Sequence, residues 1–247
     1  MIKNVYNKKD DEAYIVEEFL IGKPNKLIIC VHGFGTDRGD GGGLFFDLAK
    51  NQQNAVVVLV DLNSIDTESG LLSINNLSAQ AERLRSVISE FTTKYPELEL
   101  NLIAHSMGCA LLSKYKIRAR RVIFLAPASS NVEQALRPRL LQREGSLDDT
   151  VNRRIIAKRS DGSTTIVPYS FFDEIRSDNW VQIYQQYLQI QNPLNLIVAG
   201  EDEVLKEATK DIIKLNFSSI EVIAGADHNF ISKKEQMLKS VSSLVCL

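Results

Sequence analysis

Ser106 is the residue whose type and setting first suggest chemistry. The stretch LIAHSMGCA (102–110) puts its hydroxyl directly after an apolar run and two residues before Gly108. A strand that ends just before Ser106 and a helix that begins just after it would leave the serine on a tight turn, with its hydroxyl exposed above a sheet. Such a turn needs small neighbours, and Ala104 and Gly108 stand two residues away on either side. A serine that merely caps the helix is the alternative, and it is common.

A nucleophilic serine needs a base within hydrogen-bonding reach, and that base is usually an imidazole. The chain has three histidines. His105 precedes the serine, so strand alternation should turn its ring away from the hydroxyl, and His32 opens the glycine turn HGFG. His228, in GADHNF, remains as the candidate because it follows the last predicted strand at the carboxyl edge of the sheet. The alternative for His228 is a surface histidine in a loop.

An acid must fix the tautomer of that imidazole and stabilise its cationic form. Three candidates, Glu201, Asp202 and Glu203, follow the penultimate predicted strand in LIVAGEDEVL. We choose Asp202 because serine hydrolases with the chain order serine, acid, histidine carry their acid at this place. Glu201 and Glu203 are expected to face solvent. Asp227 is adjacent to His228 in sequence, so it is badly placed to hold the far ring nitrogen.

The glycine turn HGFG could supply a donor for a tetrahedral oxyanion. Backbone N–H groups aimed at developing negative charge lower the barrier of acyl transfer. Gly33 and Gly35 relax the backbone so that the amide of Phe34 can point inward, and the amide of Met107, at the start of the next helix, would be the second donor. Read alone, HGFG fits any glycine turn. The following RGDGGG (38–43) matches neither G-x-x-x-x-G-K-S/T nor G-x-G-x-x-G, so it is not a phosphate loop.

The elements that must position these residues alternate along the chain. Short apolar runs separated by helical patterns are typical of βαβ units, which form a mostly parallel twisted sheet with helices on both faces. Amphipathic helices are predicted at 75–95 and 229–245. The predicted strands are 26–32, 55–61, 98–105, 121–126, 194–200 and 219–225.

The region 129–192 interrupts this alternation. It is too long for an ordinary crossover, so we expect an inserted cap on a core made of residues 1–128 and 193–247. Within it, RRIIAKR and STTIVPY flank a Ser-Asp-Gly sequence (160–162), which predicts a β-hairpin with its turn at Asp-Gly. The segments YSFFDEI and NWVQIYQQYLQI then predict two helices.

The aromatic residues of these two helices leave two interpretations open. Most of them could seat the cap on the body, while one or two line a substrate pocket. The pocket candidates are Phe34, Phe171, Phe172, Trp180 and Tyr184.

Length and composition exclude several classes of protein. A chain of 247 residues can bury a large core in one α/β domain, with or without a cap. Its formal net charge of −2 gives no overall field for nucleic acid or anionic lipid, so small neutral or apolar partners remain. The N-terminus lacks a signal-peptide pattern and no apolar run reaches spanning length, so we expect a cytoplasmic protein without an integral membrane segment. The three cysteines follow no CxxC spacing, which favours buried thiols over a metal site.

The segments HGFG, AHSMG, GEDEV and GADHNF occur in the order and spacing of the α/β-hydrolase superfamily, which the chain resembles over nearly its whole length except the cap. It is most similar to small bacterial carboxylesterases of the cinnamoyl-esterase and monoacylglycerol-lipase kind, whose cap is likewise inserted after the sixth strand. The resemblance implies a triad of Ser106, Asp202 and His228, oxyanion donors at Phe34 and Met107, and no metal or organic cofactor. The chain departs from its relatives at DLNSIDTESG, where they often carry a GHG turn.

The predicted activity is hydrolysis of a small-molecule carboxylic ester through an acyl-enzyme on Ser106. Two alternatives stay open. The same triad could act on thioester, peptide or carbon–carbon bonds, or the fold could serve as a noncatalytic ligand receptor. Such a receptor usually lacks a member of the triad, and none is missing here. The sequence makes no prediction of the oligomeric state.

Overall fold

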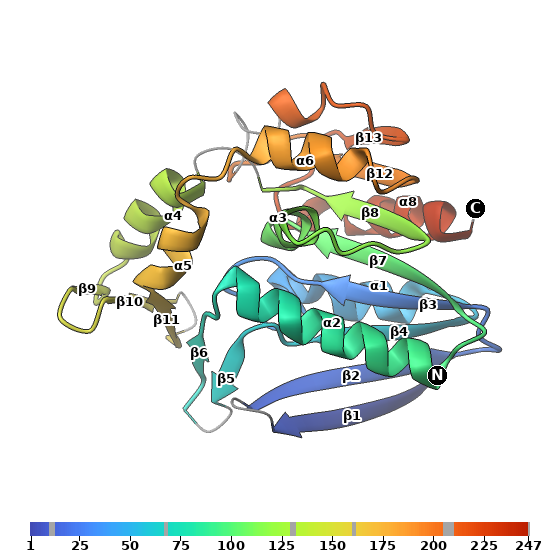
Figure 1. The fold of residues 1–247 in the computed structure, drawn as a ribbon, viewed down its shortest axis with the longest axis horizontal. Coiled ribbons are helices and arrows are strands. Elements are labelled where there is room, and N and C mark those ends of the chain that lie inside the picture. The colour runs from blue at the N-terminus through green and yellow to red at the C-terminus, as the bar shows by residue number, and fades with distance from the viewer. Residues whose placement is uncertain (10–12, 67–68, 129–131, 160–161, 205–209, 247) are drawn as a thin grey trace.

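An eight-stranded sheet forms the centre of the protein in the computed structural model (Figure 1). The structure describes residues 1–9, 13–66, 69–128, 132–159, 162–204 and 210–246. The strands lie side by side in the order β1-β2-β4-β3-β7-β8-β12-β13. Their bounds are β1 Ile2–Lys9, β2 Ala13–Ile21, β3 Lys26–Val31, β4 Ala55–Val60, β7 Glu99–His105, β8 Arg121–Leu125, β12 Leu194–Ala199 and β13 Ser219–Ile223.

Six of these strands run parallel, which confirms the predicted mostly parallel sheet. All neighbouring pairs from β4 to β13 are parallel, whereas β1 and β2 form an antiparallel hairpin that joins the edge at β4. The hairpin was not predicted. Parallel strands end at the same edge of a sheet, so the segments that follow β3, β7, β12 and β13 meet there.

The central strands are buried on both faces. Every residue of β4 and β12 is buried, as expected for parallel strands covered by helices on either side. In β3 the side chains alternate between two separate cores: Leu27, Ile29 and Val31 belong to one, and Ile28 and Cys30 to the other. The sheet therefore divides the body into two apolar layers.

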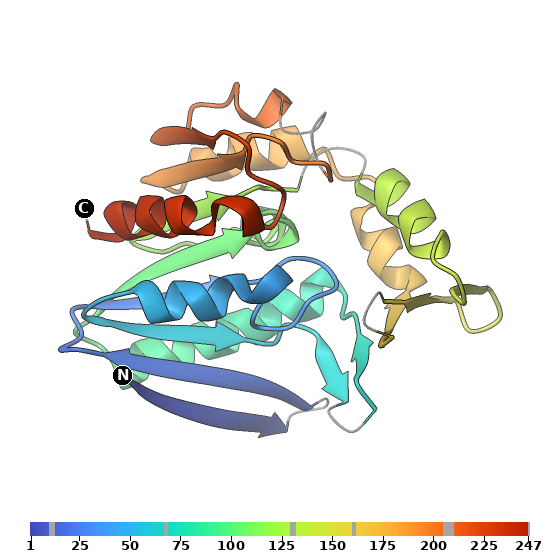
Figure 2. The same cartoon turned by 180° about the vertical axis from the view of Figure 1, so that it is seen from behind.

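Helices cover both faces, as predicted. On one face lie α2 (Leu77–Lys94), α3 (Met107–Lys114) and α6 (Trp180–Leu188) (Figure 1). On the other face lie α1 (Leu44–Asn51) and α8 (Lys234–Cys246) (Figure 2). Among the described residues, no helix is long and apolar enough to cross a membrane.

An insertion between β8 and β12 forms a second layer beside the carboxyl edge of the sheet (Figures 1 and 2). Its strands β10 (Arg154–Lys158) and β11 (Thr164–Pro168) are antiparallel, which confirms the predicted hairpin. Ser160 and Asp161 of the predicted turn lie outside the described residues. The remaining elements of the insertion are α4 (Val132–Leu141), β9 (Leu147–Asp149), α5 (Tyr169–Ile175) and α6.

Two short strands from the body complete the sheet of the insertion. Its order is β5-β6-β11-β10-β9, in which β5 (Ser64–Asp66) and β6 (Leu71–Ser73) come from the segment after β4. Strand β6 pairs in parallel with β11. The departure DLNSIDTESG includes β5, which extends this sheet by pairing with β6; its residues 67 and 68 lie outside the described residues.

Candidate active site

Ser106 lies on a strained turn between β7 and α3. Its backbone has φ 51° and ψ −116°, a conformation that few residues other than glycine adopt. The turn is pinned because the Ser106 amide donates to the carbonyl of Leu125 at 2.9 Å. Ser106 is the N-cap residue of α3, but its side chain makes no capping hydrogen bond to the helix. The hydroxyl is left available for another partner.

The small neighbour that this turn requires is Gly108. A Cβ built on Gly108 would stand 2.3 Å from the carbonyl oxygen of Val31 and 2.8 Å from that of His32. Helix α3 can therefore approach the end of β3 only because residue 108 has no side chain. This approach brings the turn after β3 against the nucleophile turn, where a Cβ on Gly33 would be 3.1 Å from the Cβ of Ser106.

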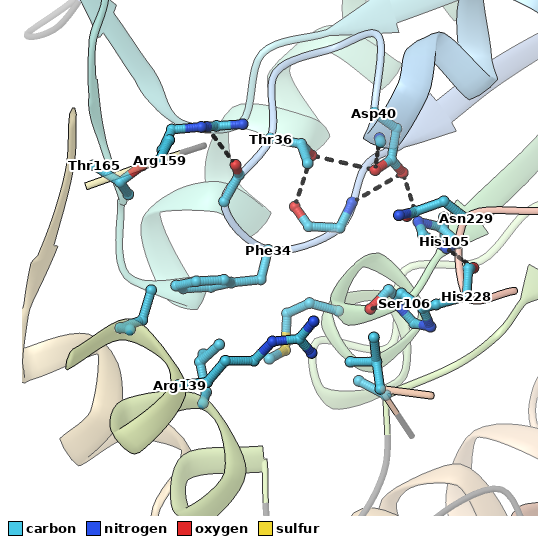
Figure 3. Close-up of a pocket in the computed structure, with 18 of the residues that line it drawn as sticks. Phe34, Thr36, Asp40, His105, Ser106, Arg139, Arg159, Thr165, His228 and Asn229 are labelled. Atoms are coloured by element: carbon cyan, nitrogen blue, oxygen red, sulfur yellow. Dashed lines mark hydrogen bonds and ion pairs between the residues drawn. The ribbon is translucent and has the colours of Figure 1, made fainter. Parts of the chain in front are cut away.

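His228 links the serine to an acid. Its Nε2 lies 3.0 Å from the Ser106 Oγ, and its Nδ1 lies 2.8 Å from the Asp202 Oδ2. A carboxylate can only accept, so Nδ1 carries the proton and Nε2 is free to accept from the serine hydroxyl. Figure 3 shows Ser106 and His228 adjacent at one wall of a pocket. The structure thus brings together the three residues of the predicted triad.

Asp202 is buried and held in place by the chain that follows it. Its Oδ1 accepts from the amide of Val204 at 2.8 Å, while Oδ2 faces His228. Glu201 and Glu203 are exposed, as expected, although a Glu203 carboxylate oxygen accepts from the His228 amide at 3.3 Å. Asp227 instead accepts from amides of its own loop, including that of Ser232 at 2.9 Å.

Phe34 and Met107 both line the pocket beside Ser106. Met107 is the first residue of α3, and the first N–H groups of a helix have no partner within it. Phe34 follows the tight approach at Gly33, whose own amide donates to Asp40 at 3.2 Å. Neither the Phe34 nor the Met107 amide donates to another group among the described residues, so both can serve an oxyanion.

A second buried carboxylate and histidine stand behind the triad. Asp40 Oδ2 lies 2.8 Å from His105 Nδ1, and His105 Nε2 lies 3.0 Å from the carbonyl oxygen of His228 (Figure 3). Both partners of His105 are acceptors, so both ring nitrogens donate and the ring is an imidazolium. Sequence reasoning turned His105 away from the serine but found no role for it, and it missed Asp40.

Asp40 and His105 are both buried, and each stabilises the charged form of the other. Burial raises the pKa of Asp40, but the facing charge and hydrogen bond of His105 outweigh burial and lower that pKa to about 2. Burial lowers the pKa of His105, but the Asp40 carboxylate outweighs it, so the pKa lies above its usual value. Asp40 also accepts from Thr36 and from the amides of Gly33 and Gly41. The pair therefore ties the turn after β3 to the backbone of His228.

His32 has a different state and a structural role. Its Nδ1 faces the carbonyl oxygen of Gly33 at 2.8 Å, and its Nε2 accepts from the amide of Leu62 at 2.9 Å. One nitrogen donates and the other accepts, so the ring is neutral. His32 therefore fixes the oxyanion turn to the segment after β4.

A cavity of about 450 Å³ opens at Ser106. Of the predicted pocket residues only Phe34 lines it; the assignments of Phe171, Phe172, Trp180 and Tyr184 are wrong. Each of these four side chains is at most 1% exposed and belongs to the core. Large aromatic rings contribute most when fully buried, and here they fill the space between insertion and body. Phe171 contacts the outer side of the site, with its ring 5.2 Å from that of Phe34.

The pocket wall opposite the triad comes from residues that sequence reasoning missed. Helix α4 supplies Leu136, Arg139 and Leu140, and the chain after it supplies Arg143. Arg159, just after β10, completes the set. The cluster of arginines and leucines in RPRLLQRE (137–144) was the available signal, although nothing in the sequence showed which of its side chains would face Ser106.

No metal centre is found in the part of the chain that the structure describes: no three His, Cys, Asp or Glu side chains are grouped to hold an ion. Cys30 and Cys109 are buried thiols, and burial raises the pKa of both. Cys246 is an exposed thiol.

Comparison with known proteins identifies one matching protein family and many solved structures with a similar fold. A model of the alpha/beta hydrolase family matches residues 28–236. A search of curated protein sequences finds no match. Est1E from Butyrivibrio proteoclasticus has a similar structure, with a TM-score of 0.70 and 14% identity over 99% of this chain and 97% of that one. The same protein has also been solved with ferulic acid bound.

Two further structures show the range of similar proteins. The esterase domain of a Rhodothermus marinus protein has a TM-score of 0.66 and 16% identity, over 98% of this chain and 97% of that chain. Dienelactone hydrolase from Anabaena variabilis has a TM-score of 0.56 and 14% identity, over 99% and 97%. At these identities the likeness concerns the fold.

Proposed function

The chain belongs to the α/β-hydrolase family, and from that premise we propose that it is a serine hydrolase that cleaves carboxylic esters through an acyl-enzyme. The observation that carries the proposal is the unbroken series of contacts from Ser106 through His228 to Asp202, at the wall of a cavity. A noncatalytic receptor would have no need of this series, in which every polar atom has the partner that nucleophilic catalysis requires.

The reaction begins with attack by the Ser106 Oγ on the ester carbonyl carbon. His228 Nε2 takes the hydroxyl proton, and Asp202 stabilises the resulting imidazolium through Nδ1. The carbonyl oxygen becomes an oxyanion, which the amides of Phe34 and Met107 stabilise. His228 then gives its proton to the departing alcohol oxygen, which leaves an acyl group on Ser106.

The second half of the reaction releases the acid. A water molecule takes the place of the alcohol, His228 removes one of its protons, and the hydroxide attacks the acyl carbon. Collapse of the second oxyanion breaks the bond to Ser106, whose Oγ recovers a proton from His228. Among the bonds open to such a triad, the names of similar structures favour esters: one is an esterase domain, and Est1E has been solved with ferulic acid, a carboxylic acid, bound.

The test combines labelling with turnover. A fluorophosphonate probe followed by peptide mapping is expected to modify Ser106, and p-nitrophenyl butyrate is expected to be hydrolysed. Ser106→Ala should remove both, with a fall in kcat of about 10⁶-fold. Asp202→Asn should lower kcat by about 10⁴-fold because it leaves the wrong tautomer of His228. Glu201→Gln, the matched control on the adjacent exposed residue, should leave the rate unchanged.

Two results would contradict the proposal. Wild-type turnover by the Ser106→Ala variant would remove this serine from the mechanism, and a greater loss in Glu201→Gln than in Asp202→Asn would reassign the acid. Activated thioesters and aminoacyl amides are assayed in parallel to determine which type of bond the protein cleaves. A higher kcat/KM on either class than on esters would replace the ester assignment.

A further inference from the structure

Three arginines of the insertion line the same cavity as Ser106. They are Arg139 on α4, Arg143 just after α4, and Arg159 just after β10. Figure 3 shows the side chain of Arg139 extending from α4 toward the middle of the pocket, between Phe34 and Ser106. Arg159 lies on the other side of Phe34, where its guanidinium donates to the carbonyl oxygen of Gly35 at 2.7 Å.

The charges of Arg139 and Arg143 are not neutralised within the described part of the chain. Neither forms an ion pair there, and the contact of Arg143 is to a neutral group, the carbonyl oxygen of Lys158 at 3.1 Å. Arg137 is different: it lies on the same helix but pairs with Asp148 at 3.0 Å and does not line the cavity. Helix α4 thus presents an uncompensated cation to the pocket.

Within the part of the chain that the structure describes, the pocket offers these cations no unpaired carboxylate. Asp40 is the one acidic residue among the described residues that line the cavity, and its charge is already matched by His105. A protein whose formal net charge is −2 therefore has a positively charged wall beside its nucleophile. Charges that line a cleft act on a ligand more strongly than the same charges on an open surface.

The other residues that line the cavity determine the surface between the arginine side chains and Ser106. Leu136, Leu140, Met107, Val204 and Phe34 give the pocket an apolar stretch. A ligand that fills it would present carbon to these side chains and an anionic oxygen group to the guanidinium groups, which bind such groups through two parallel hydrogen bonds.

We propose that the substrate is an ester whose non-reacting part ends in an anionic group, a carboxylate or a phosphate, and that Arg139 and Arg143 bind this group. The proposal rests on the proposed function, since it describes the substrate of the same serine. It also revises the expectation of a neutral or apolar partner.

The test compares pairs of esters that differ only in charge. p-Nitrophenyl hydrogen adipate carries a free carboxylate at the far end of its acyl chain, and its methyl-capped twin is neutral. We expect kcat/KM of the wild-type protein to be at least about tenfold higher for the anion, mainly through KM, because an ion pair in a cleft favours binding. Butyrate esters of 3-hydroxybenzoate and of its methyl ester extend the comparison to the alcohol side. An acyl chain that ends in phosphate separates phosphate from carboxylate.

The double variant Arg139→Gln/Arg143→Gln should lose the preference for anions, so that kcat/KM for each anionic ester falls to that of its neutral counterpart. Each single variant should lose part of this preference. Arg153→Gln is the matched control: it removes the same charge from the same insertion at an exposed residue outside the cavity, and should keep the preference in full. Salt should weaken the preference of the wild-type protein.

A binding measurement keeps this inference separate from the proposed activity. Monomethyl adipate and dimethyl adipate are titrated calorimetrically into the Ser106→Ala variant, so the result does not depend on turnover. Tighter binding of the anion, lost in the double arginine variant, supports the inference even if no ester is hydrolysed. The inference is overturned if the two ligands bind equally and if kcat/KM is also equal for the anionic and neutral esters, in both the adipate and the butyrate series. This holds even if Ser106 proves to be the nucleophile.

Discussion

His105 shows how the residue next to the nucleophile can matter without touching it. Its imidazolium lies between the Asp40 carboxylate and the carbonyl oxygen of His228. One end of this link belongs to the segment after β3 that carries Phe34, and the other to the loop that carries His228. Two loops distant in sequence are therefore held at a fixed spacing by one charged ring.

Removal of the Asp40 charge should expose this role. In Asp40→Asn, His105 loses the carboxylate that raises its pKa, and a buried cation without a partner is costly. We expect the free energy of unfolding to fall by about 3–5 kcal/mol at pH 6. The loss should shrink as pH rises, because the stability that a raised histidine pKa contributes is complete below pH 6.5 and disappears through the folded-state pKa.

Urea unfolding of both proteins at pH 6, 7.5 and 9 measures this difference. Asp40, whose pKa is lowered to about 2, stays ionised throughout that range, so the difference between the two proteins changes only because His105 loses its charge. Asp47→Asn is the control, since its carboxylate pairs with Lys234 at the surface and should give a small difference that does not change with pH. A loss in Asp40→Asn that is equal at all three pH values would contradict a charged His105.

At the residue scale, roles that follow from residue type could be predicted from the sequence, whereas roles that depend on the direction of a side chain could not. Ser106 and His228 were identified because few side chains can act as nucleophile and base. Asp40 was missed because RGDGGG has the composition of a simple loop. Phe171 and Trp180 were wrongly placed in the pocket, since an aromatic residue in a helix can face either the core or a cavity, and only the packing decides.

The turn between β7 and α3 is the element on which the site depends most. Helix α3 approaches β3 so closely that the backbone carbonyl of Val31 occupies the space of a side chain at Gly108. Backbone atoms cannot move aside as the end of a flexible side chain can. The position of Ser106 is therefore set by a contact between main chains.

Gly108→Ala should test this contact. The added Cβ forces α3 away from β3, so we expect the free energy of unfolding to fall by at least about 3 kcal/mol, and the reaction of Ser106 with a fluorophosphonate to slow in the protein that still folds. The control is Gly70→Ala, at φ 67° with nothing within 4 Å, which should cost only about 1–2 kcal/mol for its backbone conformation. Equal losses in the two variants would mean that the close approach is unimportant.

Most elements could be predicted because the central strands are uniformly apolar and the helices are amphipathic. The hairpin β1-β2 could not, because charged residues interrupt its pattern. Glu17 is buried against Arg38 at 2.7 Å, and Glu18 against Lys94 at 2.6 Å, partners that lie far along the chain. A buried carboxylate looks like a surface residue until its partner is known.

At the scale of the whole molecule, strand pairing and helix packing both join the insertion to the body. Strand β11 pairs with β6, and α6 packs against α3 and β8. The hydroxyl groups of Tyr184 and Tyr187 donate to the carbonyl oxygens of Ala128 and Ile117. Tyr184, one of the pocket candidates, and Tyr187 thus help to seat the insertion on the body, which was the other interpretation of these aromatic residues.

Helix α6 should therefore unfold together with the body. Trp180 is the single tryptophan of the chain and is 1% exposed at the start of α6, so its fluorescence reports on this helix. Far-ultraviolet circular dichroism reports on all helices and strands. We expect the two urea unfolding curves to coincide, as in a two-state transition. A fluorescence midpoint at clearly lower urea would show that α6 detaches first.

Strand order has a consequence for the newly made protein. Ser106 emerges from the ribosome well before Asp202 and His228, which follow β12 and β13 at the far edge of the sheet. A nascent chain that ends before residue 200 holds an alcohol with neither base nor acid beside it. On the proposed mechanism, a prematurely terminated fragment of this kind would be chemically inert toward esters.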